Sequence, residues 1–253
     1  MRSKSEKMDL TELEKKLKEG PAVFGVIGLG YVGLPLALEF AEAAVRVVGF
    51  DIDPAKVASL EKGSSYIQQI PSQRIKGFVD SGLLAATGDL ERLAEVDVIA
   101  ICVPTPLDDH RQPDLSFVEN TAREVARRLK AGQVVILEST TYPGTTRDVV
   151  RPILEEGSGL AAGSDFFLAF SPEREDPGNK EYRTRTIPKV IGALTPTGLE
   201  LVKGFYDRVF EKTVPVSSLE VAELTKIFEN TFRAVNIALV NELKVLALSM
   251  GVD

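Results

Sequence analysis

Three glycines interrupt an apolar stretch near the start of the chain, and this feature constrains the fold more than any other. Gly28, Gly30 and Gly33 follow the apolar, largely β-branched residues 22–27 and precede residues 34–44, whose composition is helical. The GxGxxG spacing alone is a weak signal. Between a buried strand and a helix, however, it is typical of a dinucleotide-binding turn at the start of a parallel sheet.

Each glycine of this turn has its own physical task. Gly28 permits the sharp turn, Gly30 lets a pyrophosphate approach the backbone, and Gly33 lets the helix pack closely on the strand. The backbone N–H groups around Tyr31 and Val32 then face the anion at the positive end of the helix dipole. A glycine turn without a ligand is the less favoured interpretation.

The second apolar run, residues 45–50, ends at Asp51. A carboxylate at the end of the second strand can accept hydrogen bonds from a ribose diol and would repel a 2′-phosphate, so the sequence favours NAD over NADP. We expect Ile52 to line the same site. Lys56 lies one turn into the following helix, where it could contact a ribose oxygen or could equally be a solvated surface lysine.

Short apolar runs alternate with helical segments along the rest of the chain, which is the pattern of βαβ units. Residues 219–250 contain no proline or glycine and carry a helical apolar stripe. We therefore predict an α/β fold, a Rossmann-like doubly wound parallel sheet followed by one long C-terminal helix. Strands after the second are predicted at residues 84–87, 96–103, 133–137, 165–170, 190–192 and 213–216.

The same pattern divides the chain into three parts. Residues 1–20 are predicted to form an N-terminal helical extension and residues 21–217 the NAD-binding domain. Residues 218–253 are predicted to form a central helix, the start of a dimerisation domain. Its apolar stripe would leave apolar area in water unless a second copy covers it, which predicts a homodimer.

Composition excludes several classes of partner. The net charge of −7 argues against nucleic acid or an anionic membrane as the main partner, and no apolar run is long enough for a membrane span. The single cysteine, Cys102, favours a reducing, cytoplasmic location and lies within an apolar run, so we expect a buried structural thiol. The only histidine, His110, lies in a polar loop, and we predict no metal site.

Polar side chains follow two of the predicted strands at the sheet edge where ligands bind. Pro104, Thr105 and Pro106 form a stiff turn after the fourth strand, which ends at Val103. Ser139 and Thr140 follow the fifth strand. The hydroxyl groups could hold water and polarise substrate oxygens, or could simply cap a helix.

Lys226 and Asn230 lie four residues apart on one face of the long helix. An amine and an amide placed side by side could polarise a substrate hydroxyl or stabilise an oxyanion. From spacing alone, a solvated face is an equally good interpretation.

Six segments occur in the order and at the spacing of one family, the UDP-glucose/GDP-mannose dehydrogenases, and the chain resembles that family from Val23 to its end. The six segments are residues 28–35, 51–54, 103–106, 138–140, 171–174 and 223–230. Residues 173–179 and 230–236 look more like the branch that acts on UDP-N-acetyl-hexosamines than the UDP-glucose branch.

This resemblance implies an NAD-dependent oxidation of a sugar C6 alcohol to a carboxylate, in nucleotide-sugar metabolism for polysaccharide biosynthesis. In that reaction one hydride transfer gives an aldehyde, a cysteine thiolate attacks it, a second transfer leaves a thioester, and water hydrolyses the thioester. The substrate implied is a UDP-sugar.

The resemblance also implies roles for individual residues, which are expectations by motif match. Thr105 and Ser139 would flank the nicotinamide half of NAD. The catalytic roles fall to four residues: Thr140 would hold the catalytic water, Glu173 would be the acid/base, Lys226 would stabilise the oxyanion, and Asn230 would hydrogen-bond the sugar.

The chain departs from the family pattern at the nucleophile. The family's cysteine lies in a Gly-Gly-His-Cys segment downstream of the long helix, before a UDP-binding domain, whereas this sequence stops at Asp253. Cys102 matches a strand position in the family and cannot substitute. Some members also carry a second glutamate where this chain has Pro177. We therefore expect only the cofactor half, incomplete for catalysis.

Two alternatives to a nucleotide-sugar dehydrogenase stay open at this point. A β-hydroxyacid dehydrogenase also places a Lys-x-x-x-Asn pair on the helix after a Rossmann domain. A non-catalytic NAD-binding module would be consistent with the missing cysteine, and it would bind NAD without turnover.

Overall fold

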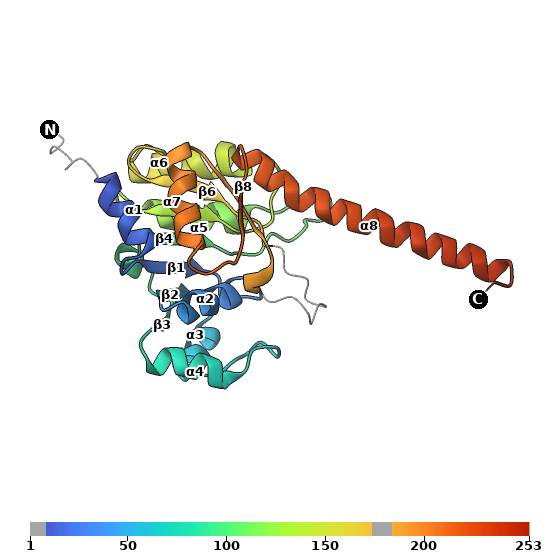
Figure 1. Ribbon diagram of the computed structural model, residues 1–253, viewed down its shortest axis with the longest axis horizontal. Coiled ribbons are helices and arrows are strands. Elements are labelled where there is room, and N and C mark those ends of the chain that lie inside the picture. The colour runs from blue at the N-terminus through green and yellow to red at the C-terminus, as the bar shows by residue number, and fades with distance from the viewer. Residues whose placement is uncertain (1–8, 174–183, 253) are drawn as a thin grey trace.

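One eight-stranded sheet forms the centre of the computed structural model, which describes residues 9–173 and 184–252 (Figure 1). The strand order is β3-β2-β1-β4-β5-β6-β7-β8. The order reverses between β1 and β4, and an α/β sheet binds its ligand outside the strand ends at such a reversal. The strands are β1 (Val23–Ile27), β2 (Arg46–Phe50), β3 (Leu84–Thr87), β4 (Val98–Ile101), β5 (Val134–Leu137), β6 (Phe167–Phe170), β7 (Lys189–Ala193) and β8 (Thr213–Pro215).

The predicted α/β fold class is confirmed, and each predicted strand has a counterpart. The apolar runs fold as buried strands because both faces of the sheet are covered by helices, so no alternation of polar residues is needed. The helices are α1 (Leu10–Lys18), α2 (Gly33–Glu42), α3 (Pro54–Glu61), α4 (Ser72–Asp80), α5 (Ser116–Ala126), α6 (Arg151–Ser158), α7 (Pro196–Tyr206) and α8 (Leu219–Ser249).

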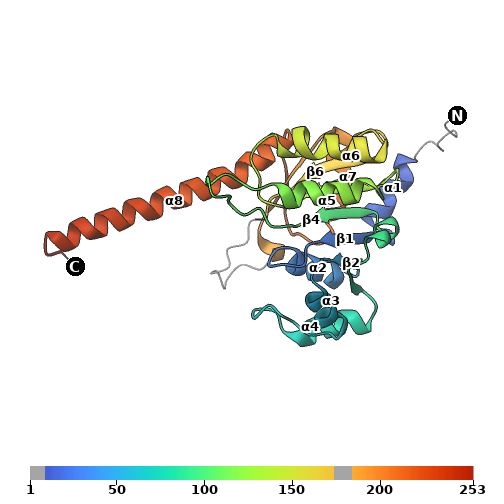
Figure 2. The same ribbon diagram turned by 180° about the vertical axis from the view of Figure 1, so that it is seen from behind.

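Two apolar cores lie on opposite faces of the sheet. On one face, Phe24 and Phe40 pack against Phe205, with ring centroids of Phe40 and Phe205 4.8 Å apart. The other face, turned to the viewer in Figure 2, is covered by α5 and α6. Because successive residues of β1 point to opposite faces, Val26 joins the first core and Ile27 the second.

The last two strands depart from the predicted uniform parallel sheet. β7 pairs antiparallel to β6, with Ala169 opposite Ala193, and β8 runs parallel to β7. A parallel return would need a crossover, usually a helix. β7 instead returns in the opposite direction, and the 3₁₀ turn Thr184–Thr186 lies shortly before it.

The two helices at the ends of the described chain differ in how they are covered. α1 packs on α7, where Leu17 is fully buried, Leu13 is half-buried and Leu10 is exposed. α8 is anchored only by its first turn, where Leu219, Ala222 and Glu223 are buried, and then projects away from the sheet (Figure 1). No helix in the described part of the chain is long and apolar enough to cross a membrane.

Candidate active site

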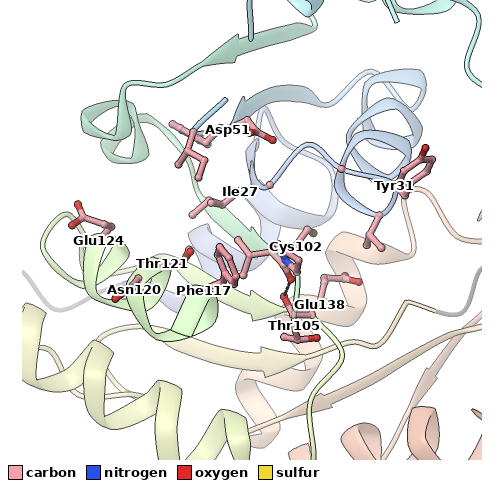
Figure 3. Close-up of a pocket in the computed structure, with 18 of the residues that line it drawn as sticks. Ile27, Tyr31, Asp51, Cys102, Thr105, Phe117, Asn120, Thr121, Glu124 and Glu138 are labelled. Carbon is pink, nitrogen blue, oxygen red and sulfur yellow. Dashed lines mark hydrogen bonds between the residues drawn. The ribbon is translucent and has the colours of Figure 1, made fainter. Parts of the chain in front are cut away.

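A cavity of about 790 Å³ opens at the carboxyl ends of β1, β2, β4 and β5, where the strand order reverses (Figure 3). This volume is in the range of small-molecule sites. Figure 3 shows Asp51 and Glu138 at opposite sides of it, with Ile27 and Cys102 between them. Twelve of the thirteen predicted cofactor-binding residues line it: Gly28, Gly30, Tyr31, Val32, Asp51, Ile52, Lys56, Val103, Pro104, Thr105, Ser139 and Thr140.

The thirteenth residue, Gly33, lies behind the turn. A Cβ atom at Gly33 would lie 1.9 Å from the carbonyl oxygen of Gly28, whereas one at Gly30 would meet nothing within 4 Å. Gly28 itself has φ +93°, a left-handed conformation that favours glycine. The open side of the turn is therefore at Gly30, and Gly33 serves close packing.

The start of α2 fits an anion. The helix begins after Val32, and no described side chain caps it. The Leu34 amide donates to the Gly30 carbonyl at 3.1 Å and Pro35 has no N–H, so the amides that can meet an anion are those of Val32 and Gly33. With the open backbone at Gly30, these groups form a cradle that fits the pyrophosphate of a dinucleotide.

Asp51 is held by three donors at the end of β2. Its Oδ2 accepts from the Leu29 amide at 2.8 Å and from Lys56 Nζ at 3.2 Å, and its Oδ1 accepts from the Asp53 amide at 2.9 Å. Lys56 is thus an ion-pair partner at the cavity wall and is not simply solvated. Tyr66 Oη donates to the Leu29 carbonyl at 2.5 Å, which holds the glycine turn from the other side.

Two hydrogen bonds join the polar ends of β4 and β5 on the far side of the cavity. Ser139 Oγ donates to the Val103 carbonyl at 2.7 Å, and Thr105 Oγ1 donates to the Thr140 carbonyl at 2.8 Å. These hydroxyls do not cap a helix. They set the shape of the cavity wall opposite Asp51.

A buried ion pair under this wall was not predicted from the sequence. Lys189 Nζ lies 2.6 Å from Glu138 Oε2 and 3.6 Å from Glu173 Oε2, and Tyr206 Oη donates to Glu138 Oε1. The Lys189 and Glu138 side chains are 4% and 0% exposed. The only sequence signal for them is a charged residue beside each apolar strand.

Burial shifts the pKa values of this group in a consistent way. Burial raises the pKa of the Glu138 carboxyl and of the Tyr206 hydroxyl. Burial opposes the charge on Lys189, but the carboxylates of Glu138 and Glu173 outweigh it and raise the pKa of Lys189 to about 12. The two carboxylates therefore favour the charged form of Lys189 beside the cavity.

The four predicted catalytic residues are only partly brought together. Thr140 and Glu173 line the cavity. Lys226 is half-buried on α8, where burial lowers the pKa of its amine while the Glu173 carboxylate opposes that shift. Asn230 is exposed one turn further along α8 and does not line the cavity.

Comparison with known proteins gives the family. The model of the UDP-glucose/GDP-mannose dehydrogenase family's NAD-binding domain matches residues 22–210, and that of its central domain matches residues 220–253. The chain belongs to the UDP-glucose/GDP-mannose dehydrogenase family. Because the larger match is to the NAD-binding domain, the predicted cofactor, NAD, is confirmed.

Relatives in this family include nucleotide-sugar dehydrogenases. A UDP-N-acetyl-D-glucosamine 6-dehydrogenase of Pseudomonas aeruginosa is 43% identical over 90% of this chain and 53% of its own length. A UDP-N-acetyl-D-mannosamine dehydrogenase of Pyrococcus horikoshii is 38% identical over 90% of this chain and 54% of its own length. The chain thus spans about half the length of the curated relatives it matches.

Solved structures of the family share the architecture. The Pyrococcus horikoshii UDP-D-ManNAc dehydrogenase superposes with a TM-score of 0.86 and 37% identity over 91% of this chain and 55% of that one. A 3-hydroxyisobutyrate dehydrogenase of Mycobacterium tuberculosis matches with a TM-score of 0.64 but 18% identity, over 92% of this chain and 67% of that one, which shows the fold alone. The β-hydroxyacid alternative is therefore not favoured.

The carboxylate of Glu223 connects α8 to the segment that follows β5. Glu223 belongs to the family motif at residues 223–230. Glu223, fully buried, accepts from the amides of Gly144 and Thr146 at 2.6 and 2.8 Å and from Thr146 Oγ1 at 2.7 Å. These residues begin a short π-helix, Thr145–Val150, which follows the loop that carries Thr140. Glu223 thereby fixes the start of α8 to the segment that follows β5.

One wall of the cavity was missed by sequence reasoning. Its residues come from α5, namely Phe117, Asn120, Thr121 and Glu124 (Figure 3). They belong to no motif, so no signal in the sequence marks them. In the structure the Phe117 side chain is 41% exposed on this face of α5.

Two further expectations concern Cys102 and His110. Cys102 is buried as predicted, and burial raises its pKa well above the ordinary value, which argues against a thiolate there. His110 is exposed in its loop, and the described residues contain no group of three His, Cys, Asp or Glu that could hold a metal ion. Pro177 lies outside the described residues.

Proposed function

We propose that this chain is the cofactor half of an NAD-dependent nucleotide-sugar 6-dehydrogenase, which oxidises the C6 alcohol of a UDP-N-acetyl-hexosamine or of UDP-glucose to a uronate. One observation carries the proposal. Within the family's NAD-binding domain, the cavity has the glycine turn and Asp51 on one side and Thr140 with Glu173 on the other. The relatives named above support a UDP-N-acetyl-hexosamine as the substrate class.

Residues on different sides of the cavity bind different parts of NAD. NAD, when bound, supplies the hydride acceptor. The amides at the start of α2 bind the pyrophosphate past Gly30, while Asp51 and Lys56 bind the adenosine ribose. Thr105 and Ser139 flank the nicotinamide half, since this half of a dinucleotide lies over the strands beyond the reversal point.

Two of the predicted catalytic residues, Thr140 and Glu173, line the substrate side of the same cavity, and the other two lie on α8. Thr140 holds the water that hydrolyses the thioester, and Glu173 exchanges protons with the reacting oxygen. The Lys226 ammonium stabilises the oxyanion, helped by burial, which strengthens its electrostatic interactions. Asn230 hydrogen-bonds the sugar, and its exposure is consistent with contact to a ligand outside the cavity.

The predictions of a dimer, a location and a domain division belong to the same proposal. The chain forms a homodimer through α8, supported by the large apolar side chains exposed along that helix. A cytoplasmic location is supported by the single buried thiol. The division at residues 20 and 217 is supported by family matches that start at residue 22 and change domain between residues 210 and 220.

The first experiment separates binding from turnover. We expect the 253-residue chain to bind NAD in calorimetry and to form no uronate from UDP-N-acetylglucosamine, UDP-N-acetylmannosamine or UDP-glucose. Uronate formed by this chain alone would contradict the assignment as a cofactor half.

The second experiment identifies the substrate. Extracts that express the gene containing this chain, including any sequence beyond residue 253, are assayed for NADH production on the three UDP-sugars and on short β-hydroxyacids. Turnover of a UDP-sugar alone supports the proposal. NAD binding with no turnover of any substrate would favour the non-catalytic module.

A further inference from the structure

The buried ion pair of Glu138 and Lys189 presents its negative end to the cavity. Glu138 lines the cavity, and its Oε2 accepts from Lys189 Nζ at 2.6 Å. The Lys189 side chain does not line the cavity, and its ammonium also lies 3.6 Å from Oε2 of Glu173, which does. The two carboxylates therefore stand between the ammonium and the cavity.

The direction of β7 places the ammonium behind these carboxylates. In a parallel strand Lys189 would lie at the opposite edge of the sheet, but the antiparallel pairing of β7 with β6 brings it to the carboxyl end of β6. Glu138 directly follows β5 at the same edge. Because both side chains are buried, the order of the two charges is fixed.

The hydrogen bonds of Glu138 are those of an ionised carboxylate. Its Oε2 accepts from Lys189 Nζ and its Oε1 accepts from Tyr206 Oη, so both oxygens act as acceptors. A buried ammonium also requires a charged partner, because an isolated charge in the interior is costly. Glu138 therefore contributes a negative charge to this wall.

Other titratable groups leave this wall negative. Cys102 lines it too, but burial raises the pKa of its thiol well above the ordinary value, so the thiol is neutral at pH 7. Among the described residues that line the cavity, Lys56 is the one cation, and it pairs with Asp51 across the cavity. Lys226 is half-buried on α8 and does not line the cavity.

The nicotinamide ring is the part of the cofactor whose charge changes in the reaction, since it is a cation in NAD and neutral in NADH. The proposed function places this ring by Ser139, which directly follows Glu138, and Figure 3 shows Glu138 across the cavity from Asp51. We propose that the Glu138–Lys189 pair makes the site favour NAD over NADH, because its negative end stabilises the cationic ring alone.

This preference suits a reaction with two hydride transfers, and the inference rests on the proposed function for the position of the ring. The proposed oxidation uses two molecules of NAD for each sugar, so the first NADH must leave before the second NAD binds. A charge that weakens NADH binding relative to NAD binding favours that exchange. Glu138 is then a specificity-determining residue for the oxidation state of the cofactor.

The test compares three ligands by calorimetry on the 253-residue chain: NAD, NADH and ADP-ribose, which lacks the nicotinamide ring. Glu138→Gln keeps the size of the side chain and removes its charge. We expect the ratio of the Kd for NAD to the Kd for NADH to rise by about fivefold, as for one charge lost several ångströms away in a partly buried site. ADP-ribose should bind the variant and the wild type equally well.

Glu124→Gln is the matched control, because Glu124 also lines the cavity but lies on α5, apart from Glu138 (Figure 3). This substitution should leave the ratio of the two Kd values unchanged. An unchanged ratio in Glu138→Gln would overturn the proposal. A loss of ADP-ribose binding as large as the loss of NAD binding would also overturn it, since the effect would then not lie at the ring.

A second variant keeps the proposal testable if Glu138→Gln does not fold. The double variant Glu138→Gln/Lys189→Met removes both charges of the pair and leaves no ammonium buried without Glu138. Its ratio should rise by about twofold, less than in the single variant, because the lost negative charge is nearer to the cavity than the lost positive charge. An unchanged or lower ratio would overturn the proposal.

The binding measurements use no UDP-sugar, so the two proposals can fail separately. The expected ratios without turnover of any UDP-sugar by the complete gene product would reject the proposed function alone. Turnover of a UDP-sugar with unchanged ratios would reject only the role of the Glu138–Lys189 pair.

Discussion

Some side chains around the cavity could be predicted from the residues next to them in the sequence, and others could not. Asp51 could be predicted because its place after the second strand is set by local sequence, and the structure puts it at the cavity. Lys189 could not, because its partner Glu138 is 51 residues away and meets it only through the direction of β7. Contacts of this kind depend on topology, which local patterns do not encode.

Asp51 gives the first prediction at this scale. We expect Asp51→Ala to weaken NAD binding by about tenfold, the loss of about 1.5 kcal/mol for a hydrogen bond to a charged group. NADP binding should change less, so the preference between the two cofactors narrows. Calorimetry with both cofactors measures this. Asp80→Ala, an exposed aspartate on α4 outside the cavity, is the control. An unchanged preference would refute the ribose assignment.

Glu220 gives a pH-dependent prediction. Its hydrogen bond from Arg147 lowers the pKa of Glu220 to about 2. A depressed folded-state pKa stabilises the protein above the unfolded value near ~4.3, and this stabilisation is lost as the pH falls toward ~2. Because a third of the side chain is exposed, solvent screening reduces the contribution to about 1 kcal/mol.

Urea unfolding at pH 7 and near pH 2 tests the contribution of the Arg147–Glu220 pair. Glu220→Gln should lower the free energy of unfolding by about 1 kcal/mol at pH 7, and the difference should vanish near pH 2. The control is Glu61→Gln, at an exposed residue at the end of α3. It should leave the free energy of unfolding unchanged at both pH values. A difference that persists at low pH would point to a cause other than ionisation.

At the scale of helices and strands, the positions of the strands could be predicted from the sequence. The direction in which the chain returns from one strand to the next could not. β1 to β6 arise from continuous apolar runs because both faces of the sheet are buried. The reversal of β7 depends on how the chain returns after β6, and residues 171–188 carry no periodic pattern that specifies a direction.

The junction of β7 and α8 gives a prediction for packing. A Cβ atom at Gly192 would lie 2.4 Å from the Ser218 carbonyl oxygen and 2.9 Å from the Ala222 Cβ atom. We expect Gly192→Ala to lower the free energy of unfolding by about 2 kcal/mol, since a close-packed contact cannot relax fully. Gly77→Ala on α4, where a Cβ atom meets nothing within 4 Å, should be neutral or stabilising by about 0.5 kcal/mol.

For the whole molecule, the exposed length of α8 is the dominant feature. Its projecting part exposes apolar side chains over five turns or more, including Phe228, Phe232, Leu239 and Leu243. The sequence predicted the helix and its apolar stripe, because no glycine or proline interrupts it. The described residues of one copy leave this stripe uncovered.

The dimer prediction is tested on the full chain. We expect sedimentation to show a dimer at micromolar concentration, and the double variant Phe232→Glu/Leu239→Glu to shift it to monomer by placing charge in the apolar contact. Glu61→Gln, on the sheet domain, should leave the dimer intact. A monomeric wild-type chain would count against the assembly through α8.

The glycine turn is held in place by contacts of Leu29 with the rest of the protein. Leu29 is fully buried, with its side chain packed closely over Gly49, while its backbone amide and carbonyl are held by Asp51 and Tyr66. A segment that is already ordered has no conformational step to complete when its ligand binds. The observed rate of NAD association should therefore rise linearly with NAD concentration, without a slow phase that saturates.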